Sequence, residues 1–278
     1  MKVVLFCGGQ GMRMRDYSEL VPKPMVPIGP RQILWHVMRW YAHYGHTDFV
    51  LCLGHGDRVI KEYFLEYKEW ISNDFVLSGG GAQVVMVNKD LDDWTITFVD
   101  TGRTSCIGER LRRVRPFVEG DGTFLANYSD CLTDVHLPDV IDHHRRSGAV
   151  GTMTVVPPNR TFHVIDADTD GIVSHIGPAT TTGMWINGGY LVLDDAVFDE
   201  LGPDEELVTD VFPRLAKRGL VSAFRHTGNW MSVDTFKERQ EAEELYLAGS
   251  PFWAVWQRSD DDGDGDGRER TWRELTPF

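Results

Sequence analysis

A buried strand that breaks into glycines opens the chain and limits the folds available to it. Val3 to Cys7 is an apolar, β-branched run, and it is followed by Gly8, Gly9 and Gly11. Because glycine has no side chain, the backbone N–H groups of such a turn stay uncovered and can surround a polyphosphate. The pattern predicts a phosphate-binding turn at the end of a buried strand.

Basic residues follow this turn. Arg13 and Arg15 lie just after it, and Lys23 stands between two prolines that hold its segment extended. Two familiar glycine loops do not fit, because a dinucleotide-binding turn needs a third glycine at the start of a helix and a Walker A loop needs Gly-Lys-Ser/Thr. The sequence therefore predicts a cationic phosphate-binding loop of another type.

Strand and helix patterns alternate through the first half of the chain. Apolar spacing predicts helices at 31–44, 59–70, 111–118 and 138–147, and strands at 48–53 and 123–127. Residues 83–87 and 95–99 are predicted to form two strands of a hairpin, joined by 88–93. This alternation predicts an α/β fold with a doubly wound, mostly parallel mixed sheet.

Shorter strands are predicted after Val150, at 151–156, 163–165, 172–176, 186–193 and 221–224, with helices at 207–218 and 235–247. We expect one domain over residues 1–256, with a small β-rich part at roughly 151–235. Residues 257–278 contain the acidic run SDDDGDGDG, whose spacing lacks the final Glu of a calcium loop. A flexible acidic tail is predicted there.

Composition excludes several classes of protein. The chain has 278 residues and a net charge of −14, whereas a nucleic-acid-binding protein would show a basic face. No apolar run approaches the ~20 residues that cross a bilayer. The cysteines lack the Cys-x-x-Cys pairing of a zinc site; they are Cys7, Cys52, Cys106 and Cys131. We expect a cytoplasmic protein with reduced cysteines and no membrane or nucleic-acid partner.

Short motifs spread over residues 1–256 resemble those of the sugar-phosphate nucleotidyltransferases. The opening turn and Lys23 fit the signature G-G-x-G-T-R-L/M followed by K-P, although Met12 stands where the signature has Thr. KPMVPIG, ILWHVM, VIKEYF, FVDTG, RLRRV, INGG and VDT are similar to the glucose-1-phosphate cytidylyltransferases. The resemblance implies a Rossmann-like, GT-A-like fold, a homo-oligomer, and condensation of a nucleoside triphosphate, CTP by this likeness, with a sugar 1-phosphate.

Two aspartates are candidate metal ligands. Asp130 follows the strand at 123–127, at the edge where open α/β sheets bind ligands, and Asp234 lies between another strand and a helix. Position alone leaves open whether each binds a metal or caps a helix. The resemblance implies Mg²⁺ ligands, because Asp130 matches the aspartate of the family's Y-G-D-G motif and Asp234 that of F-W-x-P-M-D-T.

Further residues match nucleotide-contacting positions of the family. Arg13 and Lys23 match the basic pair expected to stabilise the departing pyrophosphate, so they join the two aspartates as candidate catalytic residues. Thr101, Gly102 and Arg110 match the T-G-x-x-x-x-x-G-x-R-L segment, which resembles a region that contacts base and phosphate. Without the resemblance, the arginines at 110, 112, 113 and 115 would be interpreted as a solvated helix face.

The side that would bind the acceptor departs from the family pattern. Asn187 and Gly188 match the I-N-G-G sugar contacts and Arg160 matches P-P-G-R-F, although paired glycines also suit a bulged strand. The E-K-P lysine that grips the acceptor phosphate is missing, since no Lys occurs between Lys89 and Lys217. We therefore expect an acceptor other than plain glucose 1-phosphate, or an Arg such as Arg160 in place of the lysine.

Two other functions stay open. A non-catalytic paralogue, acting as a regulator or partner subunit, would bind a nucleotide without turnover. A metal-dependent glycosyltransferase fits less well, because Asp130 and Asp134 are four apart and do not form its usual D-x-D.

Overall fold

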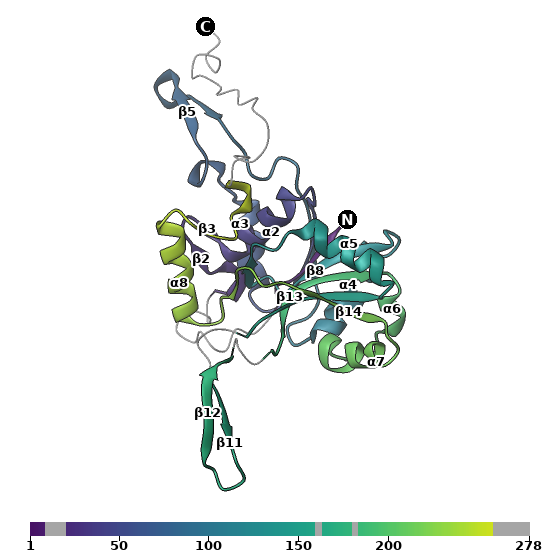
Figure 1. Cartoon of the computed structure of the whole chain (residues 1–278). Helices are drawn as coiled ribbons and strands as arrows, with labels where there is room; N and C mark the ends of the chain where they lie inside the picture. The colour runs from purple at the N-terminus through teal and green to yellow at the C-terminus, as the bar shows by residue number, and fades with distance from the viewer. Residues whose placement is uncertain (9–20, 159–162, 180–182, 258–278) are drawn as a thin grey trace.

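A seven-stranded sheet forms the centre of the protein. The computed structural model describes residues 1–8, 21–158, 163–179 and 183–257. Within these ranges the sheet consists of β1 (Val3–Phe6), β4 (Asp48–Leu53), β7 (Thr95–Asp100), β8 (Thr123–Asn127), β10 (Gly151–Val156), β13 (Ile186–Asp194) and β14 (Val221–Arg225). Its spatial order is β14-β10-β13-β8-β1-β4-β7 (Figure 1).

The sheet is mostly parallel. β13 runs antiparallel to both of its neighbours, β8 and β10, while the other neighbouring pairs are parallel. The carboxyl ends of β1, β4, β7, β8, β10 and β14 therefore lie along one edge, which is where open α/β sheets bind their ligands. The mixed, mostly parallel sheet confirms the predicted fold class.

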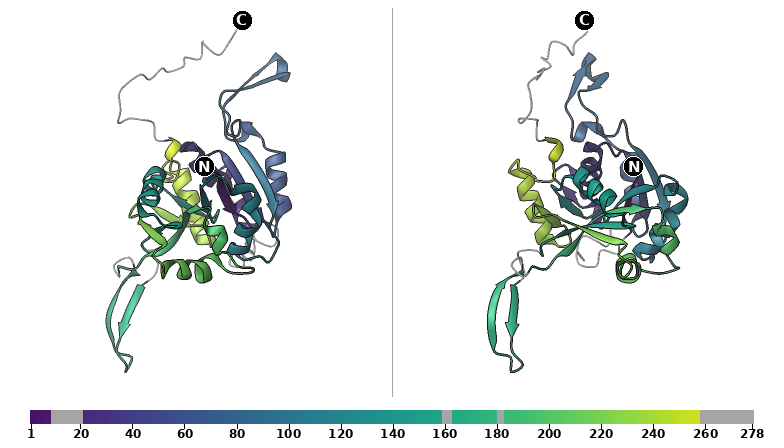
Figure 2. Two further views of the ribbon diagram at one scale, coloured as in Figure 1. Left: turned by 90° about the vertical axis from the view of Figure 1, so that its right-hand side faces the viewer. Right: turned by 45° about the vertical axis from the view of Figure 1, so that its right-hand side comes forward.

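Helices cover both faces of the sheet, as the views in Figure 2 show. One face carries α2 (Ile33–His43), α3 (Asp57–Leu65) and α5 (Leu137–Ser147). The other carries α4 (Ile107–Val118), α6 (Val197–Glu200) and α7 (Phe212–Ala216). β1 contributes to both cores, since Val3 and Leu5 face the first and Val4 and Phe6 the second. This alternation is the two-residue period of a strand buried on both sides.

Two small antiparallel sheets bring distant segments together. β2 (Pro27–Ile28) pairs with β3 (Arg31–Gln32), just after a 3₁₀ turn at Lys23–Met25. β9 (Cys131–Thr133) pairs with β15 (Trp230–Ser232), and Val233 N donates to Asp130 O at 2.9 Å. Because α8 (Phe236–Leu247) begins directly after this pairing, the loop before β9 lies beside the loop before α8.

Two hairpins project from opposite ends of the body in Figure 1. One consists of β5 (Phe75–Ser78) and β6 (Gln83–Met86), and the other of β11 (His163–Ala167) and β12 (Val173–Pro178). The predicted hairpin between 83–87 and 95–99 is therefore wrong. The residues of β7 join the central sheet because Ile96 and Phe98 pack against its core, whereas the β6 side chains are largely exposed.

Two predicted helices are shorter than expected. α3 ends at Leu65, and Glu69–Ile71 forms a separate 3₁₀ turn. The segment predicted at 207–218 consists of a π-helical turn, Leu207–Val211, followed by α7. Further 3₁₀ turns lie at Gly79–Gly81 and Val255–Gln257. Among the residues described, no helix has the length and apolar character to cross a bilayer.

Candidate active site

Lys23 lies between the two aspartates that are predicted to bind a metal. Its Nζ forms an ion pair with Asp234 Oδ1 and lies 3.7 Å from Asp130 Oδ2. The 3₁₀ turn that begins at Lys23 buries Pro24 and Met25, so the lysine is held at the start of an anchored turn. Three predicted catalytic residues from distant parts of the sequence therefore meet at one point.

Neither aspartate caps a helix. The N-cap of α8 is Thr235, whose Oγ1 accepts from Glu238 N while Glu238 Oε2 accepts from Thr235 N at 2.9 Å. Asp130 precedes strand β9 rather than a helix. The alternative interpretation of both residues as helix caps is wrong, and neither carboxylate is used to cap a helix.

The electrostatics of this group favour a bound cation. The pKa of the Asp130 carboxyl is raised to about 6, mainly by burial; the Lys23 charge lowers it and the nearby Asp234 charge raises it. Two carboxylates held this close repel each other when both are ionised, and added positive charge relieves that repulsion. Mg²⁺ commonly takes one or two carboxylates and completes its shell with water and phosphate oxygens, so Asp130 and Asp234 are a fitting pair of ligands.

A cavity of about 730 Å³ opens beside Asp130. It lies at the carboxyl edge of the sheet, and its walls include Gly8, Arg110 and Tyr128, together with the residues that lead into α4, Arg103 to Cys106. Three predicted site residues, Gly8, Arg110 and Asp130, thus line one space of a size typical of small-molecule sites.

Arg110 fixes the floor of this cavity. Its guanidinium is buried and donates to Gly8 O at 2.9 Å, to Leu53 O at 3.1 Å and to Thr101 Oγ1 at 2.8 Å. A Cβ on Gly8 would lie 2.1 Å from Arg110 Nη1, so a larger residue there would have to displace the guanidinium from its present position. No carboxylate in the described part of the chain pairs with this guanidinium. Its positive charge is therefore left to act on a ligand in the cavity.

The other arginines of α4 behave differently. Arg112 and Arg113 pair with Glu109 at 2.7 and 2.8 Å, and Arg115 pairs with Glu119 at 2.6 Å. These three form the solvated helix face, and Arg110 does not belong to it. Thr101 ends up buried as a support for Arg110, and Gly102, which follows it, adopts a φ of 88°.

Ser129 connects the end of β1 to the Asp130 loop. It is fully buried and has a φ of 63°, in the left-handed region that favours glycine. Its Oγ lies 2.8 Å from Phe6 O at the end of β1, and its N–H donates to Asn127 Oδ1 at 2.6 Å. The serine thereby fixes the backbone just before Asp130. A serine beside the predicted metal ligand, where the family has glycine, was the sequence signal for this role.

The predicted sugar contacts, Asn187 and Gly188, lie next to Tyr128 and Trp230. Asn187 Nδ2 donates to Tyr128 OH at 2.9 Å, and Gly188 O accepts from Trp230 Nε1 at 2.8 Å. β13 bulges here, because its pairing with β10 shifts register, and Gly189 has a φ of 79°. The bulged-strand interpretation is thus correct, and it is compatible with a binding role.

Arg225 is a candidate that the sequence analysis missed. In the sheet, Val155 of β10 is paired on one side with Asn187 and on the other with Arg225, so the two polar residues lie two strands apart at the same level. The guanidinium of Arg225 lies over the Trp185 ring at 5.4 Å. A basic residue at the carboxyl end of a predicted strand was the signal that could have identified it.

Several predicted residues lie outside the described ranges. They are Gly9, Gly11, Arg13, Arg15 and Arg160, together with the acidic run of the tail. Their predicted roles stay predictions.

Comparison with known proteins assigns the family. Residues 2–249 match the family model described as Nucleotidyl transferase. A probable glucose-1-phosphate cytidylyltransferase of Bacillus subtilis is 36% identical over 258 residues, covering 92% of this chain and 100% of the relative. The glucose-1-phosphate cytidylyltransferase of Salmonella typhi is 35% identical over 263 residues, with the same coverage.

Solved structures share the fold at lower identity. UTP-bound UGPase from Acinetobacter baumannii aligns with a TM-score of 0.66 and 19% identity, covering 91% of this chain and 95% of the other. HddC from Yersinia pseudotuberculosis aligns with a TM-score of 0.63 and 18% identity, covering 88% and 99%. Together with the match along residues 2–249, these findings confirm the resemblance noted from the motifs. The chain belongs to the nucleotidyl transferase family.

Proposed function

We propose that this protein transfers a nucleotidyl group from a nucleoside triphosphate to the phosphate of a sugar 1-phosphate, releasing pyrophosphate. The observation that carries the proposal is Lys23 held between Asp130 and Asp234 beside the cavity at the carboxyl edge of the sheet. A cation next to two carboxylates is an arrangement suited to a metal-bound triphosphate. Family membership supports the same reaction class.

Each residue has a distinct task in this scheme. Arg110 and the backbone at Gly8 line the triphosphate side of the cavity, and Asp130 and Asp234 would hold Mg²⁺. When bound, Mg²⁺ neutralises charge on the phosphate under attack. Lys23 then faces the phosphates and offsets the charge that develops as pyrophosphate leaves. The acceptor phosphate oxygen is itself the nucleophile, so the protein supplies position and charge rather than a covalent intermediate.

We propose CTP as the preferred nucleotide, on the basis of the cytidylyltransferase relatives. Those relatives are named for glucose 1-phosphate, whereas this chain has no lysine between Lys89 and Lys217. We therefore propose a different sugar phosphate, or glucose 1-phosphate held by an arginine. Arg225 is a candidate for that arginine, in addition to Arg160. The placement of Asn187, Arg225 and Trp230 supports residues 151–235 as the acceptor-binding part of a domain over 1–256.

Pyrophosphate release tests this function. Purified protein is incubated with Mg²⁺, each of CTP, UTP, dTTP, GTP and ATP, and a panel of sugar 1-phosphates. We expect turnover with CTP and at least one acceptor, and a loss of about 100-fold or more in Asp234→Asn, because the variant removes one of two metal-binding carboxylates. Asp142→Asn is the matched control, since Asp142 lies on α5, away from the two aspartates, and pairs with Arg145 at 3.3 Å.

Two outcomes would refute the proposal. If the protein binds a nucleotide but releases no pyrophosphate with any acceptor of the panel, the proposed reaction is refuted and the non-catalytic alternative gains support. If Asp234→Asn and Asp142→Asn turn over at equal rates, the carboxylate pair is not the reaction centre.

A further inference from the structure

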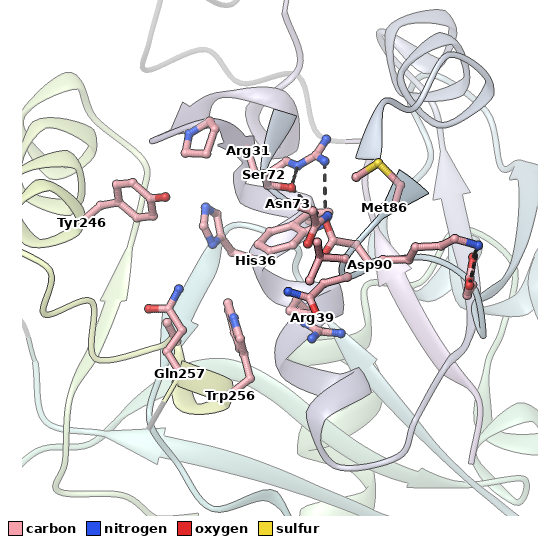
Figure 3. Close-up of a pocket in the computed structure, with 17 residues that line it drawn as sticks. Arg31, His36, Arg39, Ser72, Asn73, Met86, Asp90, Tyr246, Trp256 and Gln257 are labelled. Atoms are coloured by element: carbon pink, nitrogen blue, oxygen red, sulfur yellow. Dashed lines mark hydrogen bonds and ion pairs between the residues drawn. The ribbon is translucent and has the colours of Figure 1, made fainter. Parts of the chain in front are cut away.

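A second cavity lies apart from the candidate active site. Its volume is about 660 Å³, and none of the predicted catalytic or nucleotide-contacting residues lines it. We call it the α2 pocket, because Arg31, Trp35, His36 and Arg39, on or just before helix α2, form one wall (Figure 3). The opposite walls come from residues 72–73, 86–92 and the segment around Trp256.

Two of the three basic residues in the α2 pocket are neutralised. Arg31 pairs with Asp90 at 3.5 Å and donates to Ser72 Oγ at 2.7 Å, and Lys89 pairs with Asp92 at 2.9 Å. Arg39 is half-buried, and it has no hydrogen-bond or ion-pair partner within the described residues. In a chain of net charge −14, the pocket thus keeps one positive charge for a ligand.

Aromatic rings supply the other half of the pocket. Figure 3 shows Tyr246, His36 and Trp256 on the side opposite Asp90, and Trp35 meets Trp256 edge-on at 5.9 Å between ring centroids. Trp35 is 6% exposed, and its indole N–H has no acceptor among the residues described. That N–H is itself shielded from solvent, so the aromatic wall offers a ligand ring surface rather than this donor.

Amide groups on the rim could bind the polar edge of a planar ring. Asn73, Asn88 and Gln257 line the pocket, and side-chain amides both donate and accept. One unpaired guanidinium and flat aromatic surfaces together match a ligand with one phosphate group and one planar heterocycle. Such a ligand also fits the volume.

We propose that the α2 pocket binds a nucleoside phosphate, with its phosphate on Arg39 and its base against the aromatic wall. The pocket adjoins elements that continue into the candidate active site. Tyr246 belongs to α8, which begins directly after Asp234 and Thr235, and Gly29 N donates to Glu243 Oε2 of that helix at 3.1 Å. A ligand in the α2 pocket would therefore contact helix α8, which begins directly after the loop that carries Asp234.

Calorimetric titration with cytidine 5′-monophosphate tests the site on the full chain. Wild type should bind one equivalent more than Arg39→Ala, or bind that equivalent at least tenfold more tightly, because a guanidinium–phosphate contact is lost. Arg58→Ala is the matched control, since Arg58 is an exposed arginine that pairs with Glu62 on α3. The same ligand should quench tryptophan fluorescence more in wild type than in Trp256→Phe. Titrations with CTP and with CDP-glucose identify whether substrate-type or product-type nucleotides occupy the site.

The result is separable from the proposed reaction. Pyrophosphate release should be unchanged in Arg39→Ala, which also shows that the variant is folded. Equal binding by wild type and Arg39→Ala would overturn the α2 pocket proposal whether or not the protein is an enzyme. If wild type releases no pyrophosphate but still binds one equivalent of cytidine 5′-monophosphate more than Arg39→Ala, only the proposed nucleotidyl transfer is refuted.

Discussion

His36 should make the stability of this protein depend on pH. The ring is buried: Nε2 lies 3.0 Å from Ile28 O and Nδ1 lies 3.3 Å from Trp253 Nε1. A neutral ring satisfies both contacts, donating from Nε2 and accepting at Nδ1. A second proton on Nδ1 would oppose the indole N–H, and the Arg31 charge lies close by. Burial is the largest cause that lowers the pKa of His36 to about 4.

The sign and size of the effect follow from this pKa. Between pH 4 and pH 6.5 the unfolded chain binds a proton at His36 that the folded chain does not, so the free energy of unfolding rises with pH in that window. At about 1.4 kcal/mol per pKa unit, a fall from 6.5 to about 4 corresponds to about 3 kcal/mol. This stability is fully present above pH 6.5 and is lost as the pH falls toward 4.

Urea unfolding of wild type and His36→Gln at several values between pH 4.5 and pH 8 measures the effect. Other titrating groups, including His46, are common to both proteins and cancel in the difference between them. Wild type should be the more stable at pH 8, and its advantage should shrink by more than ~2 kcal/mol at pH 4.5. An advantage over His36→Gln that is equal at both ends of the range would refute the reasoning.

Three further outcomes are expected. Ser129→Ala should lower the free energy of unfolding by about 1–3 kcal/mol in urea, since it removes the contact with Phe6 O, and Ser129→Gly should lower it by about 1 kcal/mol less because glycine adopts a φ of 63° without strain. Arg225→Ala should raise KM for the acceptor at least tenfold while KM for the nucleotide changes little, as steady-state pyrophosphate assays would report. Trp40→Ala should cost about 3–5 kcal/mol in the same urea assay, because Trp40 is 1% exposed and contacts the Tyr41 and Tyr190 rings.

The central sheet was predictable because its strands are buried on both faces. β4, β8 and β10 begin and end at the residues predicted for them, since each is rich in apolar and β-branched residues. The β5–β6 hairpin was not predictable, because Phe75–Ser78 has no buried face that would impose an alternation of apolar and polar residues. The partner of Gln83–Met86 was therefore assigned to the nearest other strand along the chain.

The meeting of Asp130 and Asp234 followed from family resemblance and not from local pattern. It depends on β9 and β15, two strands of three residues separated by about 100 positions in the sequence. Strands so short leave no periodicity, and their pairing is decided by the tertiary fold. The buried position of Arg110 could have been derived, because Arg110, Val114 and Val118 lie four apart and share one face of α4.

The residues proposed to bind the nucleotide are more deeply buried than those proposed to bind the acceptor. This difference can explain why the sequence departs from the family motifs mainly on the acceptor side. On the side proposed to bind the nucleotide, Arg110 and Thr101 are buried and joined to each other and to the carbonyls of Leu53 and Gly8, so a substitution there would leave buried polar groups unpaired. On the side proposed to bind the acceptor, Arg225 and Asn229 are exposed, and the strand carrying Asn187 is bulged. A change there costs little stability. The loss of the E-K-P lysine is thus easier to accommodate than any change at Arg110, which favours an altered acceptor over an altered nucleotide-binding mode.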